Sequence, residues 1–218
     1  MPRYDPRDRF FLQAKKDGLR ARSAYKIDEI QRRFRLLRKG DRVLDLGAAP
    51  GGFCQIAAEA VGPTGFVLGL DLEKIPTLPP PVATWVADAF TPELLARLRS
   101  EGRAPYDAVL SDLAPKTSGA RMTDEARSLA LAERALGLSL QVLKPSGCFV
   151  VKVFMGGDFE GFQKLCKQSF EQVKGVKPEA SAARHSKELY LVCQRPRRQA
   201  ATLPGQGEQA TQGTAENT

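Results

Sequence analysis

A chain of 218 residues with 42% hydrophobic and 27% charged residues has the length and composition of one globular domain with a substantial core. No apolar run approaches the roughly 20 residues that span a bilayer, and the start of the chain has no apolar signal segment, so we expect a cytoplasmic protein. The net charge of +8 arises in residues 1–42, which carry 14 Lys and Arg against 6 Asp and Glu, and this asymmetry favours a polyanionic partner over a merely solvated basic face.

Residues 1–22 are predicted to form a basic arm that could lie along a nucleic-acid backbone, although a terminus of this kind can equally be disordered. From Ser23, which can cap the start, we predict an amphipathic helix, because apolar residues recur at helical spacing. These residues are Ile27, Ile30, Phe34 and Leu37. Lys26 lies at the edge of this apolar stripe, so its ammonium group is expected to reach the domain and not bulk solvent.

Arginines occupy the other faces of this predicted helix and its C-terminal end. They are Arg32, Arg33, Arg35 and Arg38. One helix could therefore pack on the domain and contact RNA or DNA at the same time, and we expect these arginines to bind nucleic acid.

A strand is predicted from Arg42 to Leu46, followed by a turn rich in glycine and small residues and by a helix that continues to Val61. Such a turn presents backbone N–H groups at a helix N-terminus and can cradle a ligand. The glycine spacing is not the G-x-G-x-x-G pattern that binds a dinucleotide, and the Asp45 carboxylate would repel phosphates. A cationic ligand such as S-adenosylmethionine fits better, and a turn that serves packing alone is the alternative. The predicted cofactor-binding residues of this stretch are Asp45, Gly47, Gly51, Gly52 and Phe53.

Carboxylates recur at the ends of the strands predicted after this turn. The strands over 65–70, 83–87 and 106–111 are followed by Asp71, Asp88 and Asp112. An acid 20 residues past Gly51 commonly binds a ribose hydroxyl pair, and Asp88 could accept from an adenine amino group or be a plain loop carboxylate. Because ligands in open α/β sheets bind outside the carboxyl ends of the strands, we expect these acids to line one site with Asp45.

In the second half of the chain, a long helix is predicted from Thr123, its capping residue, to Leu143. The next predicted strand, Cys148 to Phe154, is nearly all apolar except for Lys152. A lysine in a strand buried on both faces is costly unless it is paired or functional, and an edge position in solvent is the alternative. The last predicted elements are a helix over 159–170, strands over 172–176 and 188–193, and a disordered tail over 196–218.

The four cysteines are widely spaced and the chain has a single histidine. This pattern favours neither a zinc site nor a disulfide framework, and it argues against a multi-histidine metal centre. We therefore expect reduced cysteines in the core, no metal, and a chain that has no need to be more than a monomer.

Taken together, these residues resemble the FtsJ family of S-adenosylmethionine-dependent ribose 2′-O-methyltransferases. The resemblance extends in order from Ser23 to Tyr190 and includes an aromatic residue, Phe53, where the family often has tryptophan. The matching motifs are Ser23-Ala24-Tyr25-Lys26, the stretch from Asp45 to Phe53, Asp112-Leu113-Ala114-Pro115 with Ser118-Gly119, Val151-Lys152-Val153-Phe154, and Ser186-Lys187-Glu188-Leu189-Tyr190.

The resemblance implies an α/β fold of the Rossmann-like methyltransferase type over residues 23–195. Its sheet would have seven strands, mostly parallel with an antiparallel last strand, and helices on both faces. It also implies a catalytic set of Lys26, Asp112, Lys152 and Glu188. Bacterial members act on a uridine ribose of 23S ribosomal RNA, preferentially in the assembled large subunit, and related members act on transfer RNA or caps.

The chemistry of these residues is consistent with methyl transfer to a ribose hydroxyl, in which the enzyme mainly aligns the oxygen and accepts its proton. Lys152 is the predicted base, and Asp112 and Glu188 are predicted to orient the lysines. Asp112 is also predicted to contact the methionyl end of the methyl donor. Two other classes stay open: a non-catalytic ribosome-assembly factor that binds RNA, and a nicotinamide-dependent oxidoreductase, which the missing G-x-G-x-x-G argues against.

Overall fold

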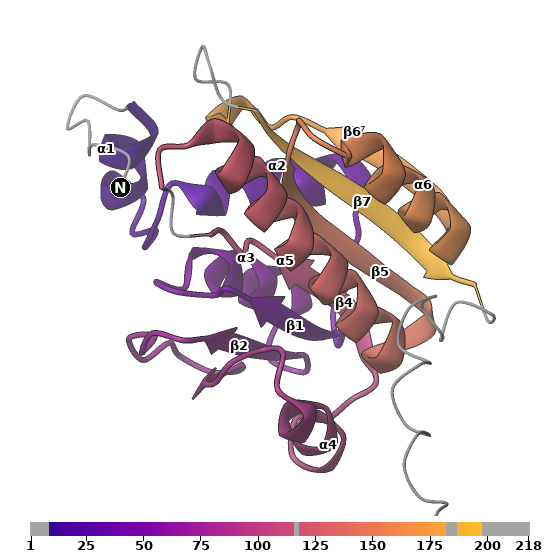
Figure 1. The fold of residues 1–218 in the computed structure, drawn as a ribbon. Coiled ribbons are helices and arrows are strands. Elements are labelled where there is room, and N and C mark those ends of the chain that lie inside the picture. Colours follow the sequence, from indigo (N-terminus) through magenta and orange to yellow (C-terminus); the bar gives the residue numbers. More distant parts are fainter. Residues whose placement is uncertain (1–8, 116–117, 182–186, 198–218) are drawn as a thin grey trace, which may run out of the picture.

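A seven-stranded sheet organises the chain, with the strand order β3-β2-β1-β4-β5-β7-β6 (Figure 1). The computed structural model describes residues 9–115, 118–181 and 187–197, so most of the predicted tail lies outside the described residues. Strand β7 pairs antiparallel with β5 and β6, and the other pairs are parallel, as the resemblance implies. The strands are β1 Arg42–Leu46, β2 Phe66–Asp71, β3 Val82–Val86, β4 Tyr106–Ser111, β5 Leu143–Phe154, β6 Phe170–Val176 and β7 Glu188–Pro196.

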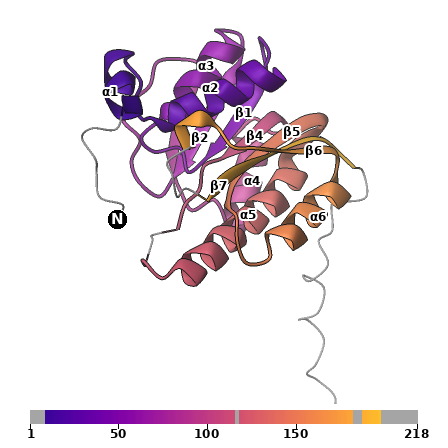
Figure 2. The ribbon, with the colours of Figure 1, turned by 90° about the horizontal axis from the view of Figure 1, so that it is seen from above.

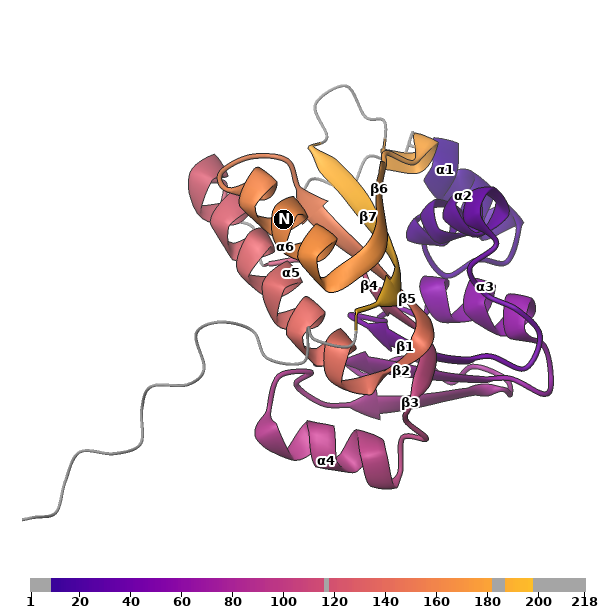
Figure 3. The same ribbon diagram turned by 90° about the vertical axis from the view of Figure 1, so that its right-hand side faces the viewer.

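Helices cover both faces of the sheet, as expected (Figures 2 and 3). On one side lie α1 Arg9–Lys16, α2 Ser23–Phe34 and α3 Gly52–Val61. On the other side lie α4 Pro92–Ser100, α5 Arg121–Val142 and α6 Phe159–Ser169. Within the described ranges, none of these helices is long and apolar enough to cross a membrane.

The alternation of side chains along the strands divides the core in two. In β1, Val43 packs in the core under α2 and α3, whereas Leu44 and Leu46 pack in the core under α4, α5 and α6. The four cysteines are free and buried in these cores, as expected. The sheet is therefore covered on both faces, which leaves the carboxyl ends of its parallel strands as the place for a site.

Both predicted helix caps are wrong. Ser23 is the first residue of α2, and the N-cap position is occupied by Arg22, whose side chain makes no capping hydrogen bond. Helix α5 begins at Arg121, before Thr123, and the carboxylate of Asp124 instead accepts from Ser118 N and Oγ at 2.8 and 2.9 Å and from Gly119 N at 3.2 Å. The carboxylate of Asp124, in the first turn of α5, therefore fixes the loop before the helix. The sequence did not predict this bond because the N–H groups of the loop reach the carboxylate only in the folded chain.

Two short helices, α1 and α4, lie in segments for which the sequence predicted none. Helix α4 has nine residues and buries Leu94 and Leu98. Helix α1 has eight residues and buries Ala14. Helices this short depend on packing against the rest of the domain, so local periodicity predicts them poorly.

Candidate active site

The turn between β1 and α3 is held to the end of β2. The N–H groups of Gly47 and Ala48 both donate to Leu70 O, at 2.9 and 3.0 Å. The N–H of Ala49 donates to Asp71 Oδ2 at 2.9 Å, and Asp71 Oδ1 accepts from Glu73 N at 2.9 Å. The predicted cofactor-binding turn is therefore hydrogen-bonded directly to Asp71, the predicted ribose-binding acid.

Gly47 leaves little space for a side chain. Its φ is +76°, a backbone conformation that favours glycine, and a Cβ there would lie 3.1 Å from the backbone N and Cα of Leu113. Leu113 follows Asp112 in the loop after β4. The glycine thus allows the turn after β1 to approach the loop that carries a predicted catalytic residue.

Replacing Gly47 by alanine should therefore destabilise the protein by about 1–3 kcal/mol and weaken binding of S-adenosylmethionine. Denaturant unfolding and calorimetric titration would measure the two effects. The matched control is Gly40→Ala, which has a φ of +86° but meets only Thr64 Oγ1 at 3.8 Å. Equal losses in the two variants would show that backbone strain, and not contact with Leu113, causes the effect.

Arg20 lies on the other side of the same turn, which the sequence did not predict. Its guanidinium donates to Pro50 O at 3.3 Å, to Pro76 O at 2.5 Å and to Thr77 O at 2.5 Å. It thereby joins the glycine turn to the loop after β2. Arg20 was predicted only as one charge of a basic arm, because the sequence does not indicate which arginine turns inward.

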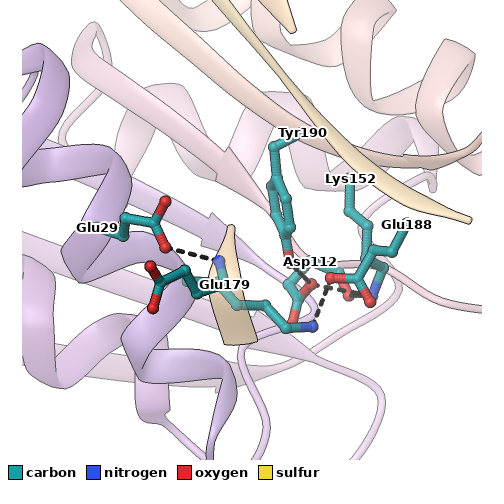
Figure 4. A network of polar contacts seen from close by, with 7 residues as sticks. Glu29, Asp112, Lys152, Glu179, Glu188 and Tyr190 are labelled. Carbon is teal, nitrogen blue, oxygen red and sulfur yellow. Dashed lines mark hydrogen bonds and ion pairs between the residues drawn. The ribbon is translucent and has the colours of Figure 1, made fainter. Parts of the chain in front are cut away.

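The predicted catalytic residues meet in one cluster (Figure 4). Lys152 Nζ lies 2.9 Å from Asp112 Oδ1 and donates to Asp112 O at 2.7 Å. The hydroxyl of Tyr190 donates to Asp112 Oδ1 at 2.6 Å. Lys26 Nζ lies 2.5 Å from Glu188 Oε1 and 5.9 Å from the centre of the Tyr190 ring. Tyr190 thus contacts both ion pairs, one through its hydroxyl and the other through its ring.

The fold explains how residues so far apart in sequence meet. In the antiparallel pairing of β5 with β7, Lys152 is opposite Tyr190 and Phe154 is opposite Glu188. Lys26 comes from α2, which buries Ala24, Ile27 and Ile30 against the domain. The carboxylate of Glu29 on the same helix accepts from the N–H of Glu179 at 2.8 Å, which ties α2 to the short helix η1 Glu179–Ser181 (Figure 4).

The cluster is largely withdrawn from water. The side chains of Lys152 and Lys26 are 7% and 8% exposed, and those of Asp112 and Glu188 are 16% and 15% exposed. Burial alone would raise the pKa of Asp112, but the ammonium groups of Lys152 and Lys26 outweigh it and hold that pKa below its usual value. Asp112 is therefore a carboxylate that orients a lysine at neutral pH.

Tyr190 is a member of the cluster that the sequence analysis did not assign. Burial, with the negative charges of Asp112 and Glu188, raises the pKa of its hydroxyl well above the usual value. It stays protonated, and its hydroxyl donates to Asp112 Oδ1. Its ring lies 6.3 Å from that of Phe53, which is 2% exposed, so Phe53 supports the cluster from the core.

Asp45 lies beneath the turn, fully buried in β1. Its Oδ2 accepts from the thiol of Cys54 at 3.2 Å, and among the described residues its Oδ1 has no hydrogen-bond partner. Burial raises its pKa to about 7 against the opposing hydrogen bond from Cys54. A buried carboxylate oxygen without a partner suits a donor from a ligand or a water.

Asp88, the fourth predicted acid, is exposed after the end of β3, and its Oδ1 accepts from Phe90 N at 2.9 Å. Val86, two residues earlier, is 62% exposed, so this end of β3 faces solvent.

In the described part of the chain, no group of three or more His, Cys, Asp or Glu side chains could hold a metal ion.

Residues 19–196 match the FtsJ-like methyltransferase family. The chain belongs to this family. It is 53% identical to ribosomal RNA large subunit methyltransferase E of Myxococcus xanthus over 190 residues, which cover 87% of this chain and 89% of that protein. The protein of the same name from Syntrophobacter fumaroxidans is 46% identical over 196 residues, covering 89% of this chain and 98% of its own.

Solved structures show that the fold is the Rossmann-like methyltransferase fold. A ribosomal RNA methyltransferase from Plasmodium falciparum superposes with a TM-score of 0.71 at 24% identity, covering 81% of this chain and 98% of its own. Human methyltransferase-like protein 13, solved in complex with SAH, superposes with a TM-score of 0.54 at 15% identity, covering 80% of this chain and 84% of its own. The FtsJ-like family and the fold agree with the sequence-based expectation.

Proposed function

We propose that this methyltransferase uses S-adenosylmethionine to methylate the 2′-hydroxyl of a uridine ribose in 23S ribosomal RNA, within the assembled large subunit, as a cytoplasmic monomer. The observation that carries the proposal is the pairing of Lys152 with Asp112 and of Lys26 with Glu188 at 2.9 and 2.5 Å, within a single chain. The large-subunit methyltransferases E to which the chain is similar support ribosomal RNA as the substrate class.

The residues around the glycine turn fit S-adenosylmethionine. When bound, this cofactor supplies a methyl group on a positively charged sulfur. Among the described residues, Asp45 Oδ1 is buried without a hydrogen-bond partner, and Gly47 leaves little space for a side chain. Both features suit a cationic ligand held close to the backbone. The residues proposed to hold the cofactor are Asp45, Gly47, Gly51, Gly52, Phe53, Asp71, Asp88 and Asp112.

In the proposed mechanism, the chain's own residues align the ribose hydroxyl and take up its proton. Lys152 accepts the proton at Nζ, for which it must be neutral, and the carbonyl and carboxylate oxygens of Asp112 fix the position of that nitrogen. Glu188 holds Lys26 beside the Tyr190 ring, where the ammonium group stabilises negative charge on the oxygen as the proton leaves. Tyr190 keeps the carboxylate of Asp112 oriented.

The exposed arginines of α2 and of the segment after it are proposed to bind the phosphate backbone. Arg32 is paired with Asp28 at 2.6 Å, and the Arg33 guanidinium lies 5.3 Å from the centre of the Phe34 ring. Arg35 ends the helix in the left-handed conformation. Arg38 is also exposed. These side chains therefore present positive charge along α2 and the segment after it.

The double variant Arg33→Gln/Arg35→Gln should bind RNA more weakly, and the slope of log K against log salt should fall by about 2, because two phosphate contacts are lost. The matched control is Arg97→Gln/Arg99→Gln, which removes two exposed arginines from α4. Binding of a 23S RNA fragment at several salt concentrations measures both. An unchanged slope for the α2 variant would mean that RNA binds elsewhere.

Methyl transfer from labelled S-adenosylmethionine tests the function itself. Undermethylated large subunits, free 23S RNA and bulk transfer RNA are compared, and the nucleosides are identified by mass spectrometry. We expect 2′-O-methyluridine, formed mainly in subunits. Label on transfer RNA would favour a transfer RNA methyltransferase, and cofactor binding without transfer to any RNA would favour a non-catalytic assembly factor.

A further inference from the structure

A charged cluster lies beside the catalytic set, where α5 begins. The carboxylate of Glu125 accepts from Arg121 Nε at 3.0 Å and from Lys187 Nζ at 2.8 Å. The Glu125 side chain is only 11% exposed, whereas those of Arg121 and Lys187 are 72% and 35% exposed. One inner carboxylate thus holds two outer cations, which leaves a net positive charge facing solvent.

The cluster is locked to the catalytic strands. The N–H of Met155 donates to Lys187 O at 2.8 Å, so the residue after β5 is bonded to the residue before β7. Gly156 approaches the Glu125 carboxylate so closely that a Cβ on it would overlap the carboxylate oxygens. Lys187 directly precedes Glu188 in the sequence. The cluster therefore lies at the end of β5 and β7 that carries Lys152 and Glu188.

Two exposed methionines accompany the two cations. Met122, next to Arg121, is 84% exposed, and Met155 is 44% exposed. Methionine is usually buried, yet two of the three methionines in this chain are exposed here. A flexible and polarisable thioether packs well on a flat aromatic ring, and nucleobases present such a face in every sequence.

We infer that Arg121, Met122, Met155 and Lys187 form a ledge that binds the nucleotide adjacent to the target uridine, with the cations on its phosphate and the methionines on its base. This inference rests on the proposed function, because it takes RNA to be the substrate at the neighbouring catalytic set. Charge selects RNA as the occupant: the ledge presents two cations, and the single carboxylate between them is turned inward. Glu125 positions the ledge and does not itself contact RNA.

The double variant Arg121→Gln/Met122→Gln tests the ledge without entering the core. Its KM for undermethylated large subunits should rise about tenfold, with kcat and the affinity for S-adenosylmethionine within twofold of wild type. Met155→Gln should act in the same direction, whereas Met155→Leu, which keeps an apolar side chain, should restore most of the loss. Arg99→Gln is the matched control for a lost exposed arginine.

Binding of a 23S RNA fragment by fluorescence anisotropy separates this inference from the proposed function. Affinity that is unchanged in the double variant would overturn the ledge, whether or not the wild-type protein methylates RNA. Weakened binding in the variant, together with no methylation by the wild type, would support the ledge and overturn the proposed function. Weaker binding with a raised KM supports both.

Discussion

Replacing Lys152 by alanine is expected to lower kcat by about 10²- to 10⁴-fold, the range of a positioned general base. No other described residue donates to both the backbone oxygen and the carboxylate of Asp112, so no neighbour can take over this nitrogen's position. Single-turnover methyl transfer at saturating S-adenosylmethionine and RNA measures the chemical step, separate from binding. Calorimetric titration should show the cofactor still bound.

The matched control lies on the same strand. Lys144 of β5 is paired with Asp107 at 2.7 Å and is 34% exposed, at the end of the strand away from the cluster. Lys144→Ala should retain kcat within twofold. If Lys152→Ala kept more than a tenth of the wild-type kcat with RNA bound, Lys152 would not be the base.

A second variant distinguishes loss of the base from loss of folding. This is needed because removing one partner of a buried ion pair is destabilising. Lys152→Arg keeps a cation beside Asp112, yet arginine cannot release its proton in a protein. It should therefore fold and bind cofactor like the wild type while losing activity as alanine does. An active Lys152→Arg enzyme would mean that the cation stabilises charge and takes up no proton.

The resemblance implies the catalytic set, whose two carboxylates are predicted to orient its two lysines. Three of the four residues also stand out in their own sequence context. Lys152 is a charge in an apolar strand, Lys26 borders an apolar helical stripe, and Asp112 ends a parallel strand. Such residues are costly in a fold unless they meet a partner, so the expectation that they converge has a physical basis. The structure pairs Lys152 with Asp112 and holds Lys26 against Glu188.

Tyr190 and Arg20 could not be predicted in the same way. The position of Tyr190 beside Lys152 depends on the register of β7 against β5, and a shift of one residue would turn its ring to the opposite face. Arg20 donates to three backbone oxygens in two loops, which meet only after the sheet has formed. In both cases the partner is fixed by tertiary structure, whereas the residue type alone indicates a strand or a charged arm.

Asp45 makes the stability of the cofactor-free protein depend on pH. Its pKa is raised to about 7, mainly by burial and further by the negative charges of Asp112 and Asp71, although the Cys54 hydrogen bond opposes the rise. Below about pH 4 the group is protonated in both the folded and the unfolded chain. Between about pH 4 and 7 only the folded chain keeps the proton, so the free energy of unfolding falls as pH rises.

The decrease in the free energy of unfolding that Asp45 causes is on the order of 4 kcal/mol. This is the free energy that corresponds to a pKa raised from its ordinary value to about 7. Asp45→Asn should abolish this part of the pH dependence, because an amide does not titrate. Urea unfolding from pH 4.5 to 8 would compare the two proteins, with Asp88→Asn as the control for an exposed acid near the same edge of the sheet. A difference between wild type and variant that stays constant over this range would show that Asp45 is ionised in the folded protein throughout.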